Sequence, residues 1–180
     1  MYKTNGYVIT GGPGAGKTTL LLALGKAGYG IIPEDARRII REQLATNGNG
    51  LPWKNRSSFF HLMWAAAASR YLSFPASGPP CFFDRGMVDC LCYAKMAGLP
   101  LPGAIEQMAR NFRYNQKVLL LPPWRSIYHN DPERKQSWQE AVLTYEQMKA
   151  IYKQYGYEIL LLPRVPVEER VAFVQQRLFV

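Results

Sequence analysis

A glycine-rich segment near the start of the chain constrains its fold more than any other feature. Residues 11–18 read Gly-Gly-Pro-Gly-Ala-Gly-Lys-Thr, and they stand between the apolar run 7–10 and the helix-like run 19–24. An apolar strand, a loop of the form G-x-x-x-x-G-K-[ST] and a helix, in that order, are typical of a phosphate-binding P-loop. Glycines let several backbone N–H groups surround one phosphate, and the N-terminus of the next helix favours the same anion. The alternative, an ordinary glycine-rich turn, requires both the pattern and its context to be accidental.

The loop predicts a site for a nucleoside triphosphate, with ATP and Mg²⁺ as the expected cofactors. Lys17 can reach the β- and γ-phosphates as a mobile charge, and the Thr18 hydroxyl can ligate the magnesium ion that bridges them. Further nucleotide contacts are expected from the rest of this segment, namely Gly11, Gly12, Pro13, Gly14, Ala15, Gly16 and Thr19.

Short apolar runs alternate with longer helical patterns along the chain, which predicts an α/β fold with a parallel sheet. The strands are expected at residues 7–10, 29–32, 81–83, 118–121 and 158–162. Their continuous apolar character suits parallel strands that are covered on both faces. With 180 residues, the chain is expected to form one domain, 1–180, with ligands at the carboxyl ends of its strands.

The helical patterns give further expectations. Pro33 suits the first position of a helix that stops at 47–50, and the pattern over 57–74 is apolar nearly all round, so His61 is expected in the core. A stripe of Ala141, Tyr145, Met148, Tyr152 and Tyr155 should face the core. Pro166 should open the last helix, whose buried stripe contains Val167, Val171, Val174 and Leu178.

Acidic and basic residues at the ends of the second and third predicted strands are candidates for chemistry. Asp84 ends an apolar strand, where it can hold magnesium, and Arg85 can face the acceptor or the transferred phosphoryl group. Glu34 or Asp35 can accept a proton from an attacking hydroxyl, and Arg37 can bind the acceptor. The structural alternatives are a turn residue for Asp84, a surface ion pair for Arg85, and acids that complement a helix dipole for Glu34 and Asp35.

Residues 124–136 are polar and basic, contain the turn signal Asn130-Asp131-Pro132, and are expected to form a lid. Arg134 can stabilise charge on the transferring phosphoryl group when such a lid closes, with Arg125 and Lys135 as alternatives. A solvated arginine is the alternative reading of this position.

The net charge of +9 favours polyanionic ligands. The basic residues are dispersed, which argues against nucleic acid as a partner: they include Arg37, Arg38, Arg41, Arg110, Arg113, Arg125, Arg134 and Arg164.

The spacing of Cys81, Cys90 and Cys92 suits neither a disulfide framework nor a zinc site, so each is expected to be a small buried hydrophobe. The start of the chain lacks the apolar region of a signal peptide and no run is long enough for a membrane span, so a cytoplasmic protein is expected.

Four stretches together resemble a known family. Residues 11–19, 33–37, 83–86 with Asp89, and 131–134 occur in an order similar to the AAA-type P-loop family that includes the ribosylnicotinamide-kinase domain of NadR. The resemblance implies a three-layer α/β/α sandwich like that of small nucleoside and nucleotide kinases, with strand order 2-3-1-4-5 and a lid after strand 4. It also implies that Glu34 is the strand-two glutamate, Asp84 the strand-three acid and Arg134 the lid arginine. However, residues 84–86 look more like the Asp-Arg motif of thymidylate and deoxynucleoside kinases, so the acceptor cannot be transferred from NadR.

Two classes of function remain open from the sequence. The first is a kinase that uses Mg-ATP to phosphorylate a small nucleoside-like or nucleotide-like acceptor. The second is a nucleotide-dependent regulatory or binding module, such as an ATPase or a GTP-binding adaptor, although no N-K-x-D-like segment is present. A mechanical AAA motor would need a further helical domain, and an ABC subunit would need an L-S-G-G-Q-like signature that the chain lacks. The acceptor and the oligomeric state are left open.

Overall fold

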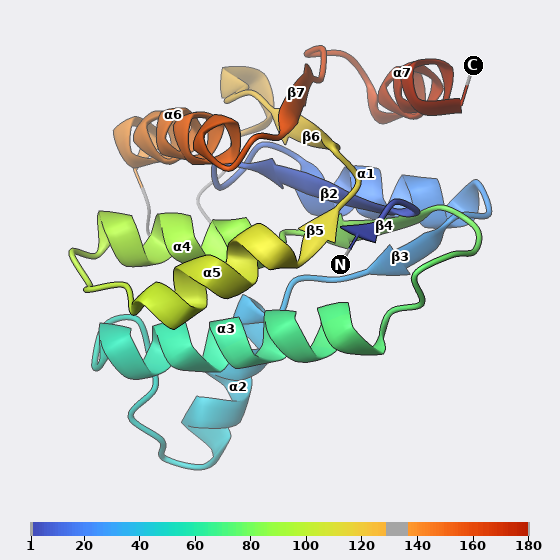
Figure 1. Ribbon diagram of the computed structural model, residues 1–180. Coiled ribbons are helices and arrows are strands. Elements are labelled where there is room, and N and C mark those ends of the chain that lie inside the picture. Colours follow the sequence, from blue (N-terminus) through green and yellow to red (C-terminus); the bar gives the residue numbers. More distant parts are fainter. Residues whose placement is uncertain (1, 129–136, 180) are drawn as a thin grey trace.

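The computed structural model describes residues 2–128 and 137–179. Its centre is a sheet of five parallel strands in the order β3-β4-β2-β6-β7 (Figure 1). These strands are β2 (Gly6–Gly11), β3 (Gly30–Ile32), β4 (Cys81–Asp84), β6 (Lys117–Leu121) and β7 (Glu158–Leu161). Counted along the chain within this sheet, the order reads 2-3-1-4-5, the order that the resemblance implied.

A second, two-stranded sheet was not predicted. It pairs β1 (Tyr2–Lys3) with β5 (Arg113–Tyr114) in parallel. Each strand has only two residues, too few to give a recognisable pattern in the sequence. This small sheet lies at the amino end of β2, on the side of the main sheet away from the P-loop.

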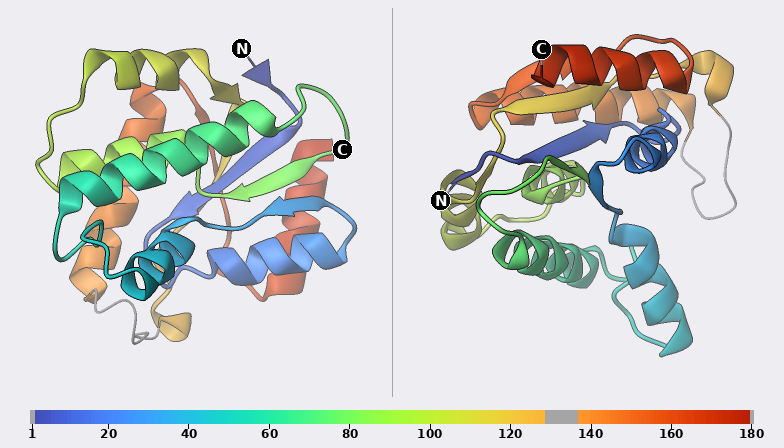
Figure 2. Two further views of the ribbon diagram at one scale, coloured as in Figure 1. Left: turned by 90° about the horizontal axis from the view of Figure 1, so that it is seen from below. Right: turned by 90° about the vertical axis from the view of Figure 1, so that its right-hand side faces the viewer.

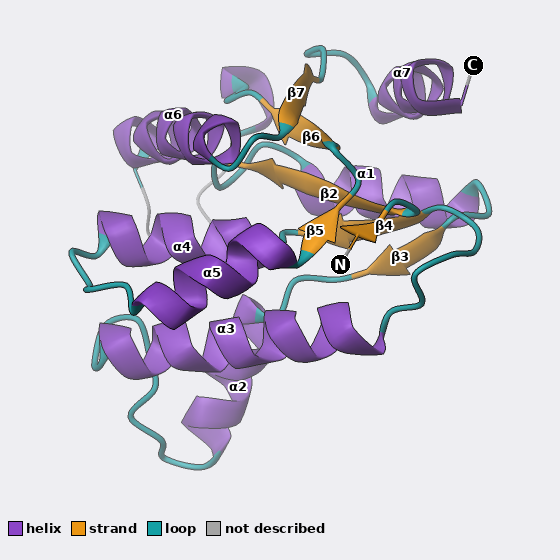
Figure 3. Cartoon of the chain, in the orientation of Figure 1, coloured by secondary structure: helices purple, strands orange, loops and turns teal. Residues whose placement is uncertain are grey.

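Helices cover both faces of the main sheet and form the three layers expected (Figure 3). On one face lie α1 (Lys17–Lys26) and α7 (Val167–Phe179), packed on Tyr7 and Ile9 of β2. On the other face, Val8 belongs to a larger core cluster that contains buried residues of four helices: α3 (Arg56–Ser73), α4 (Met87–Met96), α5 (Gly103–Asn111) and α6 (Trp138–Gln154). The two views in Figure 2 show this arrangement, with α2 (Ala36–Ala45) extending away from the sheet.

Burial of the strands follows their place in the sheet. All residues of β2 and β4 are buried, as expected for strands covered on both faces. The edge strands β3 and β7 contain only exposed and half-buried residues. The expectation of full cover therefore holds for the inner strands and is wrong for the two edges.

Two expectations about helices are also wrong. The second helix begins at Ala36 and not at Pro33, so residues 33–35 form a loop after β3. His61 is exposed, with its Nδ1 2.8 Å from the Ser57 carbonyl oxygen, because α3 buries one face rather than its whole surface. That face presents Phe59, Phe60, Trp64, Ala68 and Tyr71.

Other expectations about the core are confirmed. The predicted stripe of α6 and the residue after it is buried, including Tyr145, Met148 and Tyr152. All three cysteines are buried and unbridged. Within the part of the chain that the structure describes, no helix combines the length and the apolar character that a membrane span requires.

Candidate active site

The P-loop connects β2 to α1 at the carboxyl end of the sheet. Gly14 and Gly16 have positive φ angles of 70° and 85°, which favour glycine. A Cβ atom on Gly14 would also lie 2.6 Å from Cδ2 of Tyr128, so a larger residue would require the tyrosine ring to shift. Lys17 is buried and its Nζ donates to the Gly12 carbonyl oxygen at 2.8 Å, which holds the ammonium group inside the loop.

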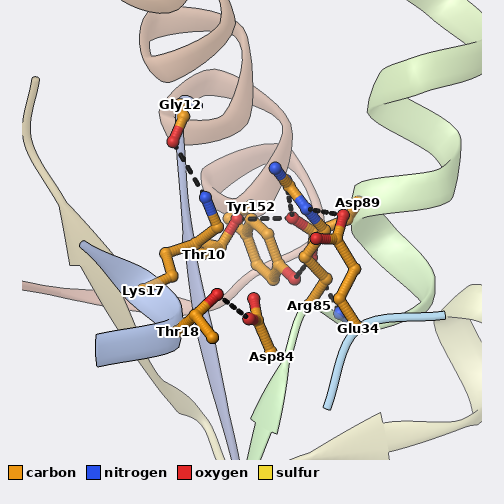
Figure 4. A network of polar contacts seen from close by, with 10 residues as sticks. Thr10, Gly12, Lys17, Thr18, Glu34, Asp84, Arg85, Asp89 and Tyr152 are labelled. Atoms are coloured by element: carbon orange, nitrogen blue, oxygen red, sulfur yellow. Dashed lines mark hydrogen bonds and ion pairs between the residues drawn. The ribbon is translucent and has the colours of Figure 1, made fainter. Parts of the chain in front are cut away.

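Thr18 and Asp84 meet beside this lysine (Figure 4). The Thr18 hydroxyl donates to Oδ2 of Asp84 at 3.3 Å. Asp84 is only 4% exposed, and its Oδ1 has no hydrogen-bond partner in the described part of the chain. Burial raises the pKa of Asp84, although nearby Lys17 lowers it in part. Mg²⁺ prefers hard oxygen ligands. The carboxylate oxygen of Asp84 without a partner among the described residues and the hydroxyl of Thr18 beside it are two such ligands, so these residues fit the ion.

Glu34 and Arg85 form a partly buried ion pair next to Asp84. Arg85 donates from Nε to Oε1 of Glu34 at 2.8 Å and from Nη1 to Oδ1 of Asp89 at 3.2 Å. Burial alone would lower the pKa of Arg85. The negative charges of Glu34, Asp89 and Asp84 raise it by a larger amount, so the pKa lies above its ordinary value. Arg85 is therefore a permanent cation that two carboxylates hold in place, and its φ of 72° is uncommon for a residue with a side chain.

Asp89 is the centre of a buried network that the sequence analysis did not assign. Its Oδ1 accepts from the Thr10 hydroxyl at 2.5 Å, and its Oδ2 accepts from the Tyr152 hydroxyl at 2.5 Å and from the Gly86 N–H at 2.8 Å. Figure 4 shows this carboxylate between the tyrosine and Arg85. The network joins β2, α4 and α6 to the arginine that contacts Glu34.

Asp35, the alternative to Glu34, is held by other partners. Its Oδ1 lies 2.9 Å from Nη2 of Arg38 and 2.7 Å from Nη2 of Arg70. Glu34 instead points toward Arg85, and its charge acts on Asp84. Both residues line the cavity described below, but Glu34 is the one that pairs with the arginine next to Asp84.

A cavity of about 500 Å³ adjoins these groups, a size suited to a small ligand. Pro13 of the P-loop, Glu34 and Asp84 line one part of it. Apolar and aromatic walls come from α3, α4 and α6, where the lining residues include Phe59, Met63, Tyr93 and Met148. A ligand in this cavity would pack against apolar side chains and present a polar end to the carboxylates.

Most of the predicted site residues in the described part of the chain come together. Lys17, Thr18, Glu34, Asp84 and Arg85 surround one region. Arg37 lies on α2 and is absent from the cavity lining, so its predicted contact with the acceptor has no geometric support.

Most of the predicted lid, 124–136, lies outside the residues that the structure describes. Its first residues include a short 3₁₀ helix, Arg125–Ile127, whereas residues 129–136, with the predicted Arg134 and Lys135, lie outside the described part. Arg85 forms ion pairs with Glu34 and Asp89 and also lines the cavity, so its predicted contact with the acceptor or the phosphoryl group stays a prediction.

Comparison with known families matches residues 6–170 to the model of AAA_28, an AAA domain. The chain belongs to this family. The matched residues include the main sheet, the P-loop, Glu34 and Asp84. A search of curated proteins returned no match.

Solved structures share the fold of this AAA domain at low sequence identity. A NadR protein in complex with NR is 20% identical with a TM-score of 0.70, over 99% of this chain and 52% of the NadR chain. The AAA domain thus spans about half the length of that NadR protein. A deoxyadenosine kinase from M. mycoides is 16% identical with a TM-score of 0.67, over 96% and 98% of the two chains. Shikimate kinase from Acinetobacter baumannii is 12% identical with a TM-score of 0.61, over 96% and 91%.

Proposed function

We propose that this AAA domain transfers the γ-phosphoryl group of ATP to a hydroxyl of a small, nucleoside-like acceptor. The observation that carries the proposal is the cavity beside the P-loop, whose polar end contains Glu34 and Asp84. A nucleotide hydrolase needs room only for water, whereas this cavity has the volume and the apolar walls of a small-molecule site. Proteins of similar fold include two kinases that act on small molecules, and these support the proposal by analogy.

Glu34 is the proposed base. Its carboxylate accepts the proton of the acceptor hydroxyl as that oxygen bonds to the γ-phosphorus of ATP. The bond between the γ-phosphorus and the β,γ-bridging oxygen breaks, and ADP leaves. The ion pair with Arg85 fixes the orientation of Glu34 before the acceptor binds, so less conformational freedom is lost in the reactive complex.

Lys17 and the backbone N–H groups of the P-loop would bind the phosphates of ATP. Thr18 and Asp84 would hold Mg²⁺, which neutralises charge on the phosphate oxygens when it is bound. Arg85 would stay charged at every working pH and attract the acceptor oxygen or the transferred phosphoryl group. We also propose that residues 124–136 form a lid that brings Arg134 to the phosphoryl group. The chain would act as one domain in the cytoplasm, where ATP is supplied.

The test is ADP formation from Mg-ATP across a panel of nucleosides, nucleotides and pyridine ribosides, with Lys17→Ala as the blank. Glu34→Gln should reduce acceptor-dependent turnover by about 100-fold or more, as is typical when a general base is lost, and leave ATP affinity within about twofold. Glu42→Gln, which removes an exposed carboxylate from α2, is the matched control and should keep full activity.

Turnover of Glu34→Gln equal to that of the unaltered protein would disprove the assignment of the base. Tight ATP binding with no stimulation by any acceptor would overturn the kinase proposal. That result would favour the second class of function, a nucleotide-dependent binding module.

A further inference from the structure

Arg170 is a buried arginine that the proposed chemistry does not use. It belongs to α7 and is only 3% exposed. Its Nη1 donates to the carbonyl oxygen of Ala15 at 3.1 Å, and its Nε donates to the carbonyl oxygen of Pro163 at 3.1 Å. The guanidinium carbon lies 4.8 Å from the centre of the Trp124 ring. The side chain thus packs against the P-loop from the side that α7 covers.

Among the residues that the structure describes, the charge of Arg170 lacks the carboxylate partner that buried arginines normally have. Within residues 2–128 and 137–179, no carboxylate forms an ion pair with it, and its Nη2 has no hydrogen-bond partner. Burial lowers the pKa of this arginine, which reflects the free-energy cost of keeping the charge there. Unpaired buried charges are rare because this cost is large. Two carbonyl hydrogen bonds offset only part of it, whereas an anion bound at the P-loop would offset more.

The hydrogen bond to Ala15 also determines where the next N–H group points. The peptide bond between Ala15 and Gly16 is planar and trans, so its carbonyl and its N–H point in opposite directions. Because Arg170 draws the carbonyl toward α7, the Gly16 N–H is directed away from α7. Gly16 has a φ of 85° and immediately precedes α1, where unpaired N–H groups favour phosphate.

We propose that Arg170 is a positioning residue for the polyphosphate of the nucleotide. It holds the Ala15–Gly16 peptide with its N–H directed toward the phosphate site, and it adds a buried positive charge behind the loop. This inference deepens the proposed function, because it rests on a nucleotide bound at the P-loop, but it does not require an acceptor or phosphoryl transfer.

A packing role alone makes a different prediction. Methionine fills a similar apolar volume and carries no charge, and replacing a buried charge by such a residue is often neutral or stabilising. If Arg170 only packed, Arg170→Met would leave nucleotide affinity unchanged, because the apolar volume is kept. If Arg170 positions the loop, nucleotide affinity should fall even where the melting temperature of the nucleotide-free protein is unchanged or raised.

The experiment measures dissociation constants for Mg-ATP and for inorganic tripolyphosphate by calorimetry, together with the melting temperature of the nucleotide-free protein. In Arg170→Met, both affinities should fall about tenfold, an effect of the size expected when one favourable interaction with a charged ligand is lost. Arg177→Met is the control, since Arg177 is an exposed arginine on the same helix, and its affinities should match those of the unaltered protein. Arg170→Lys keeps the charge but loses the forked geometry, so its affinity should be intermediate.

Affinities of Arg170→Met within twofold of the unaltered protein would overturn the inference. If that variant does not fold, Arg170→Lys decides the question by the same comparison. A protein that binds ATP but transfers no phosphate would disprove the kinase proposal and leave this inference standing. A protein that binds neither ATP nor tripolyphosphate would overturn both.

Discussion

Replacing Tyr152 by phenylalanine tests the buried network around Asp89. Tyr152 is 1% exposed, and its hydroxyl donates to Oδ2 of Asp89 at 2.5 Å. Burial first, and then the adjacent Asp89, raise the pKa of Tyr152 well above its ordinary value, so the hydroxyl stays protonated and remains a donor at working pH. Phenylalanine keeps the ring and removes only this hydrogen bond.

The expected loss of stability can be worked out from the contacts. A hydrogen bond to a charged group contributes about 1.5–3 kcal/mol, and Asp89 Oδ2 keeps its bond from the Gly86 N–H, so about 2 kcal/mol should be lost. For a domain of this size, each kcal/mol lowers the melting temperature by about 2–4 °C, which gives a decrease of about 4–8 °C. Urea unfolding followed by circular dichroism should show the same loss with an unchanged m-value.

The control is Tyr145→Phe. Tyr145 lies on the same helix and is also buried, but its hydroxyl forms no hydrogen bond within the described residues, so the variant should lose less than about 0.5 kcal/mol. Thr10→Val removes the other hydroxyl bond to Asp89, and its effect should be non-additive with that of Tyr152→Phe because both act on one carboxylate. Equal losses in Tyr152→Phe and Tyr145→Phe would refute the view that Asp89 depends on this donor.

Two further predictions follow from the buried ionisable groups. Asp84→Asn should raise the melting temperature of the nucleotide-free protein, since burial raises the Asp84 pKa and its charged form is held at a cost in stability; a lower melting temperature would contradict this. The same variant should lower turnover and need more magnesium for half-maximal activity, because it loses a ligand of the ion. Burial raises the pKa of Cys81 to about 11 and that of Cys92 to about 12, so both bind protons more tightly when folded, and stability should fall as pH rises above the unfolded thiol pKa of 9.0. Thiol titration at pH 8 should therefore show no fast reaction with these cysteines until the protein unfolds.

Features that depend on local sequence were predictable. The P-loop pattern and the apolar runs 7–10, 81–83 and 118–121 locate the strands and the carboxyl edge of the sheet, because buried strands and tight phosphate loops impose short-range requirements. The start of α2 was misplaced for the opposite reason. Pro33 and Glu34 have a local pattern that suits a first helical turn, but the contact of Glu34 with Arg85 belongs to the tertiary structure.

The network and the arginine behind the P-loop were missed, although both left a signal. Asp89 stands among the apolar residues of α4, where a carboxylate must have buried partners, yet the sequence does not show that these are Thr10 and Tyr152. Arg170 occupies the same helical face as Val171 and Val174, so a charge interrupts a predicted core stripe. A charged residue at a core-facing position is the signal that could have found both.

The order of the strands in the sheet has a consequence for the synthesis of the protein. β2 is the first strand of the main sheet to be made, but its neighbours come much later: Gly6 pairs with Cys81, and Ile9 pairs with Leu119. Contacts that are so distant in sequence form slowly, because a long loop must be closed before any pairing is gained. On the ribosome, the apolar β2 and the loop after it must therefore wait unpaired until β4 and β6 emerge. Chaperones that bind apolar segments of nascent chains would be most needed during that interval.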